Sequence, residues 1–342
     1  MCLVCQSKKS RVNYTVTELI CCPKVMSIPK EFKQLTRLEC RNCPLLTRIP
    51  KEFTQLTELI CSGCPLLLKI PKEFTLLTHL NCSLCPLLTK IPSEFKQLTQ
   101  LYCSDCNITE IPKFTQLTEL DCSGCSLLFK IPKEFTQLTQ LYCSKCPLLR
   151  VIPKEFTYLN ILDCSRCELL TVIPKEFNQL TILACYMCPL ISEIPREFTQ
   201  LSLLSCYRCP LLIEIPRELT QLTDLNCSYC PLLTKIPHEF TRLIILRSSN
   251  CYLLRKIPGE FKLTYLDCRN CPVLMEIPKK FRYQYKFLPL LSFSDRIKIT
   301  FITGKKHYLQ EEIKYNLETR HNESYYAPDG LGAQKLFEKY RN

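Results

Sequence analysis

The residues with the clearest potential for chemistry in this sequence are its 27 cysteines, because twelve pairs of them are spaced Cys-x-x-Cys. Cys40/Cys43 and Cys122/Cys125 are two of these pairs. Two Cys-x-x-Cys pairs supply the four thiolates of many structural zinc sites, so zinc binding is the first chemistry to consider. Disulfide formation is the second. Burial of reduced thiols as small apolar side chains is the third.

Two departures from the pairing favour buried, reduced thiols over a metal site. Leu19 and Ser248 stand where the first cysteine of a pair is expected. A buried position accepts such a replacement, whereas a zinc site would lose a ligand. In a stacked repeat, neighbouring cysteines would also point their Cβ atoms the same way, which disfavours disulfides between them. We therefore expect neither a bound metal nor a cofactor.

The start of the chain indicates a reducing compartment. The apolar residues Met1-Cys2-Leu3-Val4-Cys5 precede Lys8 and Lys9, which reverses the order of a signal peptide. No run of about 18 apolar residues is present to span a membrane. We expect a cytoplasmic protein with reduced cysteines. Lipid attachment or a redox role at Cys2 and Cys5 is a less favoured alternative.

All the cysteine pairs except Cys2/Cys5 belong to an internal repeat. The dipeptide Ile-Pro recurs thirteen times at intervals of 20 or 21 residues, from Pro29 to Pro278. A complete unit runs from Leu56 to Leu76 and has the pattern L-x-x-L-x-C-x-x-C-x-x-L-x-x-I-P-x-x-F. A solenoid grows by stacking such units, so the array is expected to form one domain in spite of its length.

This pattern resembles the leucine-rich repeat, with Cys at the third core leucine and Cys at the Asn/Cys position. The resemblance covers about residues 18–278. It implies an α/β solenoid: a leucine-rich-repeat arc with a parallel β-sheet on the concave face and short turns or 3-10 segments on the convex face. The near-identity of the units is also similar to repeat proteins of giant DNA viruses that infect amoebae, which would place the chain in the host-cell cytoplasm.

The alternation of residues defines the strand of each unit. Leu59 and Cys61 are expected to face the core, while Glu58, Ile60 and Ser62 face outward. The ends of such a stack need caps, which we assign to residues 1–17 and 279–342. In the second cap we expect a strand over 296–303, a helix near 308–319 and a last helix over 332–340.

One part of the outward strand face differs from the rest. Ile161, Ile182 and Leu203 occupy the same outward position in three consecutive units, so they should lie side by side. Aromatic, Met and Arg residues, which interface centres favour, accompany them. These are Tyr186, Met187, Tyr207, Tyr229, Arg166 and Arg208. We predict a protein-binding site here; the alternative is that Ile and Tyr simply favour strands. Tyr102 and Tyr142 are isolated further candidates.

The net charge of +13 does not indicate nucleic-acid binding on this face. Its outward positions hold seven basic and eight acidic residues, whereas a phosphate-binding groove needs a basic excess. Much of the positive charge lies in the two terminal segments, and these could still touch nucleic acid or an anionic surface. Behind the sheet, the residues after each Ile-Pro are usually Lys or Arg and then Glu, which predicts two solvated stripes of opposite charge.

The repeat array offers no catalytic constellation. The four histidines, at positions 79, 238, 307 and 321, have no neighbours spaced as a nucleophile–base pair or a metal trio. We expect a monomeric, non-enzymatic scaffold that binds an unidentified protein partner. Two alternatives stay open: a substrate-recognition adaptor in ubiquitin transfer, with the 279–342 segment recruiting the machinery, and a structural array that binds little.

Overall fold

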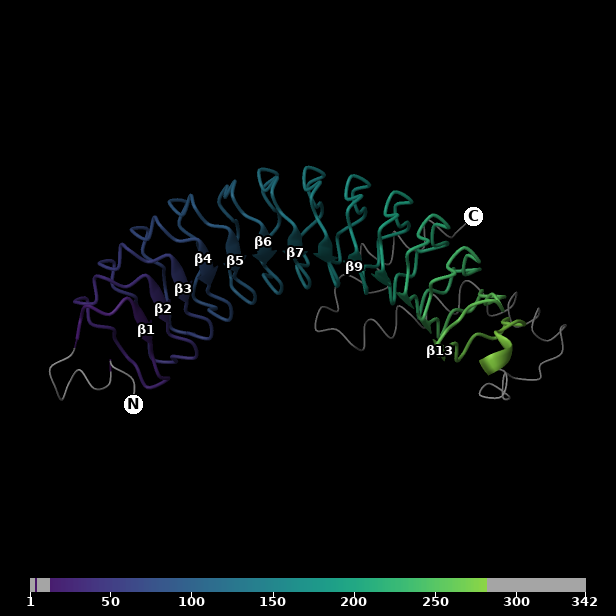
Figure 1. Ribbon diagram of the computed structural model, residues 1–342, viewed down its shortest axis with the longest axis horizontal. Helices are drawn as coiled ribbons and strands as arrows, with labels where there is room; N and C mark the ends of the chain where they lie inside the picture. Colours follow the sequence, from purple (N-terminus) through teal and green to yellow (C-terminus); the bar gives the residue numbers. More distant parts are fainter. Residues whose placement is uncertain (1–3, 5–12, 282–342) are drawn as a thin grey trace, which may run out of the picture. The chain divides into compact units, whose positions relative to one another are not determined.

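The computed structural model describes Val4 and residues 13–281. These residues form a single 13-stranded parallel sheet whose strands follow one another in chain order. Successive turns lie side by side along an arc from β1 to β13 (Figure 1). The strands are β1 (Glu18–Ile20), β2 (Arg37–Glu39), β3 (Glu58–Ile60), β4 (His79–Asn81), β5 (Gln100–Tyr102), β6 (Glu119–Asp121), β7 (Gln140–Tyr142), β8 (Ile161–Asp163), β9 (Ile182–Ala184), β10 (Leu203–Ser205), β11 (Asp224–Asn226), β12 (Ile245–Arg247) and β13 (Tyr265–Asp267).

The predicted solenoid class is therefore confirmed: one strand per repeat, in register, with almost no helix between residues 13 and 281. The central leucine of each strand pairs with the central leucine of the next, as Leu59 does with Leu80. Each strand is centred on this leucine and ends before the cysteine, one residue earlier than the predicted L-x-C span. Below, the turn that contains strand βn is called turn n.

Backbone hydrogen bonds continue beyond each three-residue strand. Before the strand, the amide of Thr78 donates to the carbonyl of Thr57 over 2.9 Å. After it, the amide of Cys61 donates to Asn81 over 2.7 Å, and the amide of Gly63 donates to Ser83 over 2.9 Å. These bonds satisfy backbone groups that a short strand would otherwise leave unpaired.

The core consists of rows of equivalent side chains that run from turn to turn. In turn 3, Leu59, Cys61, Cys64 and Phe74 are all fully buried. The rings of Phe135 and its successor in the next turn stack with centroids 6.4 Å apart. No single unit could bury these side chains alone, so the stacking of turns creates the core.

The expected burial of the repeat cysteines is confirmed. The 25 described cysteines are free thiols, and all of them except half-buried Cys22 are buried. The register corrects one assignment: Leu19 pairs with Leu38, so Cys21, and not Leu19, occupies the position of Cys40. The sequence places two cysteines next to each other at residues 21 and 22, which shifted the expected alignment. Ser248 does occupy the first-cysteine position and is fully buried.

The return stretch behind the sheet is built from turns. Pro71 accepts a hydrogen bond from the amide of Phe74, and equivalent bonds recur in later turns. The one 3-10 segment that the described residues hold is η1 (Lys279–Phe281). The chain divides after Phe281 into two units, and all thirteen strands of the described residues belong to the first. The strand and helices expected within 282–342 lie outside the described residues, and the cap boundaries stay predictions.

Candidate functional site

The strand face is defined here as the outward side chains of β1–β13 together with the two residues between each pair of repeat cysteines. In most strands the two outward residues are half-buried, as in β8 and β9. The second residue between the cysteines has a left-handed backbone in most turns, for example φ 59° at Arg166 and 58° at Tyr229. Four positions per turn thus face outward at fixed places, and only their side chains vary.

The structure brings the predicted apolar row together. Ile161 pairs with Ile182, and Ile182 pairs with Leu203, so the three side chains are direct neighbours across β8, β9 and β10. All three are half-buried. The row ends at Gln140 on one side and Asp224 on the other. It is therefore an apolar strip three strands wide with polar borders.

The predicted aromatic and basic residues gather at one end of this strip. The rings of Tyr207 and Tyr229 meet edge to face with centroids 5.3 Å apart. The guanidinium of Arg208 lies 5.2 Å from the centre of the Tyr207 ring and 4.9 Å from that of Tyr229. Such contacts between a guanidinium and aromatic faces are attractive. The three side chains form one cluster across turns 10 and 11.

Not every predicted site residue is accessible. Arg208 has only 6% of its surface exposed and Met187 only 9%. By contrast, Tyr186 is half-buried and Arg166 is exposed. Arg208 and Met187 are thus placed to hold their neighbours, while the apolar strip and the tyrosines offer the contact surface.

The two isolated tyrosines belong to a different row. Tyr102 and Tyr142 alternate with acidic residues at the third strand position, since both pair with Asp121. Their hydroxyl groups donate to the side chains of Gln100 and Gln140 over 3.4 and 3.1 Å. Burial raises the pKa of both phenols, and at Tyr102 the nearby Glu119 raises it further. The structure does not join them to the apolar strip.

Charges on the strand face neutralise one another. Arg37 contacts Glu58 at 3.0 Å and Glu39 at 3.2 Å, and these carboxylates raise its pKa. Arg247 pairs with Asp224 at 2.9 Å. The residues that the structure describes thus show paired charges in place of a continuous basic track, which agrees with the composition of this face.

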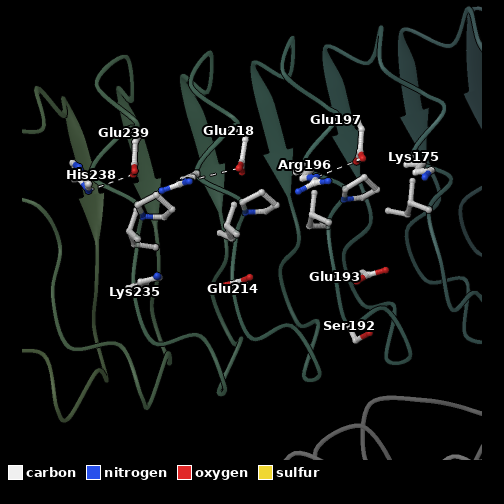
Figure 2. A pocket seen from close by; sticks show the side chains of 18 of the residues that line it. Lys175, Ser192, Glu193, Arg196, Glu197, Glu214, Glu218, Lys235, His238 and Glu239 are labelled. Carbon is white, nitrogen blue, oxygen red and sulfur yellow. Dashed lines mark ion pairs between the residues drawn. The ribbon is translucent and has the colours of Figure 1, made fainter.

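A shallow groove of about 1280 Å³ runs behind the sheet along the Ile-Pro row of turns 8–12 (Figure 2). Its rim carries the expected stripes of opposite charge, and neighbouring groups pair: Arg196 with Glu197 at 3.7 Å, and His238 with Glu239 at 3.3 Å. A second groove of about 710 Å³ follows the same row in the first turns. Because the repeat itself generates this hollow, it does not mark a dedicated site.

Within residues 13–281, no three His, Cys, Asp or Glu side chains are grouped so that they could hold a metal ion. The Nδ1 atom of His79 lies 2.7 Å from the hydroxyl of Thr78, which also donates to the carbonyl of Thr57. No carboxylate among the described residues pairs with His79 to orient it as a base.

Sequence reasoning missed a second exposed surface. Within Cys-Pro-Leu-Leu, the second leucine is fully buried, as at Leu67, whereas the first is exposed in turns 2, 3, 4 and 7. Leu45, Leu66 and Leu87 are 48%, 42% and 45% exposed. The sequence does contain a sign of this exposure: the first leucine is replaced by Asn107 in turn 5, whereas the second, buried position stays aliphatic.

Comparisons with known proteins agree on the fold. Residues 76–98, 116–138 and 221–243 match the family model described as Leucine Rich Repeat. No protein with curated annotation matches the chain. No described helix is long and apolar enough to cross a membrane.

Solved structures with a similar fold include the following three. The functional domain of InlJ from Listeria monocytogenes, described as including a cysteine ladder, is 28% identical with a TM-score of 0.65; the match covers 77% of this chain and 63% of that one. The chain thus spans less than two thirds of that structure. The internalin inlF of Listeria monocytogenes is 17% identical, with TM-score 0.59 and coverage of 80% and 92%. YopM, an effector of Yersinia pestis, is 19% identical, with TM-score 0.56 and coverage of 78% and 84%.

These comparisons do not show the expected similarity to repeat proteins of giant viruses. The two structures under 25% identity establish the architecture alone. Leucine-rich repeats are typically non-enzymatic binding scaffolds whose outward residues vary while the core is kept. The chain has the fold of a leucine-rich-repeat solenoid, and rows of buried cysteines run through its core.

Proposed function

We propose that this chain is a non-catalytic scaffold that binds a protein partner on the strand face of turns 8–11. The observation that carries the proposal is the apolar strip of Ile161, Ile182 and Leu203, which adjoins the turns of the Tyr207–Arg208–Tyr229 cluster. Interface centres favour rigid aromatic groups and arginine beside apolar surface. The cluster is held together before any partner arrives, so binding would not have to order it.

Two properties of the surface favour a protein over nucleic acid as the partner. Basic side chains on the strand face, such as Arg37 and Arg247, are already paired with carboxylates. Phosphate recognition needs unpaired basic groups along a track. The proposal includes a monomeric chain in the reducing cytoplasm, which suits a core built from thiols.

The test is affinity capture from cell extract with the full chain as bait. The triple variant Tyr186→Ser, Leu203→Ser and Tyr207→Ser should lose the partner that the wild type retains. The matched control is Tyr102→Ser with Tyr142→Ser, which removes tyrosines from the same face outside the strip and should keep the partner. Circular dichroism melting curves should show that both variants remain folded.

Retention of the partner by the folded triple variant would reject this site. Recovery of ubiquitin-ligase subunits would favour the adaptor alternative, for which the relevant 279–342 segment lies outside the described residues. Capture of nothing by the wild type would favour a purely structural array. These outcomes separate the proposed function from both alternatives.

A further inference from the structure

The exposed leucines of turns 2–4 form a second surface, independent of the strand face. Leu45, Leu66 and Leu87 follow the paired strand leucines of β2, β3 and β4 at the same distance along the chain. They are therefore neighbours in consecutive turns. We call this row the leucine edge. It faces outward beside the second cysteine of each turn, away from the residues of the proposed strand-face site.

The leucine edge is the centre of an unusually apolar patch. The exposed prolines Pro44, Pro65 and Pro86 precede its three leucines. Leu68, which follows the buried leucine of turn 3, is 60% exposed. Isolated exposed leucines need no explanation, but a contiguous group of this size marks an interaction surface. In turn 5 the row is interrupted, because Asn107 replaces the leucine and donates to the carbonyl of Pro86 over 2.9 Å. Exposed leucines return at the same position in the next two turns, at Leu127 and Leu148.

A basic row borders this patch. Arg48, Lys69 and Lys90 occupy the position three residues after each edge leucine, and all three are exposed. None of them forms an ion pair with another described residue, and the segments 40–48, 61–69 and 82–90 contain no acidic residue. In turns 9 and 10 the equivalent position holds Glu193 and Glu214. The position is also basic at Lys130, Lys235 and Lys256, so the distinctive feature of turns 2–4 is that three consecutive basic residues accompany three consecutive exposed leucines.

The spacing of the leucine edge matches a helix better than a strand. Neighbouring turns are about 4.8 Å apart at the sheet. An α-helix presents the same face every turn, about 5.4 Å, whereas a β-strand does so every second residue, about 6.6 Å or more. Over three turns, the difference between the helix pitch and the spacing of the leucines adds up to less than about 1.5 Å, which a change of side-chain rotamer can accommodate. A helix laid along the edge would place one apolar residue against each leucine.

From this combination of apolar row, positive border and spacing, we propose that the leucine edge binds an acidic amphipathic helix of a partner protein. The apolar stripe of that helix covers Leu45, Leu66 and Leu87. Acidic residues on one flank of the stripe pair with Arg48, Lys69 and Lys90. This surface is separate from the strand-face site, so each can be abolished without the other.

The test uses synthetic helical peptides of about 18 residues, long enough to cover the edge. One peptide carries a leucine stripe with glutamates on its flank, and a second has the same stripe with lysines instead. Binding of each labelled peptide to the full chain is followed by fluorescence anisotropy. The glutamate peptide should bind more tightly than the lysine peptide, and added salt should narrow the difference.

Two sets of variants make the test specific. Replacing Leu45, Leu66 and Leu87 by Ser should weaken binding of the glutamate peptide by about tenfold or more. Changing the three basic residues to Glu should reverse the preference between the peptides. The matched control replaces three exposed apolar residues elsewhere, Val151→Ser, Val172→Ser and Ile213→Ser, and should leave the affinity within about twofold.

Several results would overturn the proposal. Equal affinity for the two peptides would remove the role of the basic row, and unchanged binding by the serine variant would remove the role of the leucines. Sedimentation velocity supplies a further check: a wild-type dimer that the serine variant dissociates would show that a second copy of the chain covers the edge. None of these results depends on the strand-face variants, so failure here leaves the proposed function intact.

Discussion

The sulfur of Cys64 lies 3.0 Å from the carbonyl oxygen of Cys40, which belongs to the preceding turn. The second cysteine of each later pair up to turn 11 repeats this contact, with sulfur–oxygen distances from 3.1 to 3.3 Å. Each thiol therefore donates across the boundary between two turns, at the point where the strand has ended. The cysteine rows thus fill the core and also link its units.

We predict that Cys64→Ala lowers the free energy of unfolding by about 1–3 kcal/mol. The change leaves a cavity and removes the donor to the carbonyl of Cys40. The comparison is Cys22→Ala, at a half-buried cysteine, which should cost less than about 1 kcal/mol. Urea unfolding at neutral pH measures the loss of stability in both variants. The loss is read from the shift in the midpoint of the unfolding curve, provided that the slope of free energy against urea concentration is unchanged. Equal losses in the two variants would contradict a specific role for the buried thiol.

Alkaline pH should remove the contribution that the fully buried thiols with raised pKa make to stability. A hydrogen bond to Cys85 and complete burial raise the pKa of Cys61 well above its ordinary value of 9.0. A hydrogen bond to Cys106 and complete burial raise the pKa of Cys82 in the same way. At these thiols the folded chain keeps protons that the unfolded chain releases, so their contribution to stability is full below about pH 9 and falls as pH rises further.

Urea unfolding between pH 7.5 and 10.5 measures this dependence. The double variant Cys61→Ala and Cys82→Ala should show a weaker loss over the same interval, because two of the raised thiols are gone. Because Tyr102 also has a raised pKa, the stability of the variant should still fall somewhat at high pH. A wild-type stability that stays constant up to pH 10.5 would show that the buried thiols do not resist ionisation.

The regular spacing of Ile-Pro made the fold predictable. A constant turn length places each central leucine beside the next, as at Leu59 and Leu80, and the core and register follow from that. The prediction failed at Leu19, where adjacent cysteines made the alignment ambiguous and only strand pairing decided it. Periodicity identifies equivalent positions but does not say which of two neighbouring apolar residues faces inward.

The two surfaces differ in how far the sequence could reveal them. The row of Ile161, Ile182 and Leu203 follows directly from strand alternation. The burial of Arg208 could not be predicted, because it depends on its surroundings in the folded chain, including rings in two different turns. The leucine edge was hidden because Leu66 and Leu67 look equivalent in sequence, although only the second is in the core.

Lys145 provides a test of the left-handed position between the paired cysteines. Its φ is 56°, and its amide donates to the carbonyl of Ser165 over 2.8 Å, which fixes the backbone there. Lys145→Val should lower stability by about 1–2 kcal/mol, whereas Lys145→Gly should be neutral or stabilising. At exposed Lys133, whose φ is not positive, Gly should be the more costly substitution. If the same substitution were the more costly one at both sites, the argument that the positive φ decides the cost would be contradicted.

Gly63 combines the same backbone demand with a close neighbour. Its φ is 70°, and a Cβ atom there would lie 2.2 Å from Oδ1 of Asn42 in the preceding turn. The amide can rotate away, so most of the cost of Gly63→Ala, about 1 kcal/mol, should come from the backbone. The double variant with Asn42→Ala should therefore recover less than half of the loss. Full recovery, measured by urea unfolding, would assign the cost to the clash instead.

Ser165 offers a substitution that should strengthen the fold. Its side chain is fully buried, and its hydroxyl has no hydrogen-bond partner among the described residues. A buried hydroxyl without a partner costs free energy, so Ser165→Ala should raise the free energy of unfolding by about 1 kcal/mol. Ser144 occupies the equivalent position one turn earlier and is half-buried, so Ser144→Ala should change stability by less than about 0.5 kcal/mol. A loss of stability in Ser165→Ala would mean that the hydroxyl is bonded in the folded chain after all, since removing a satisfied buried group destabilises.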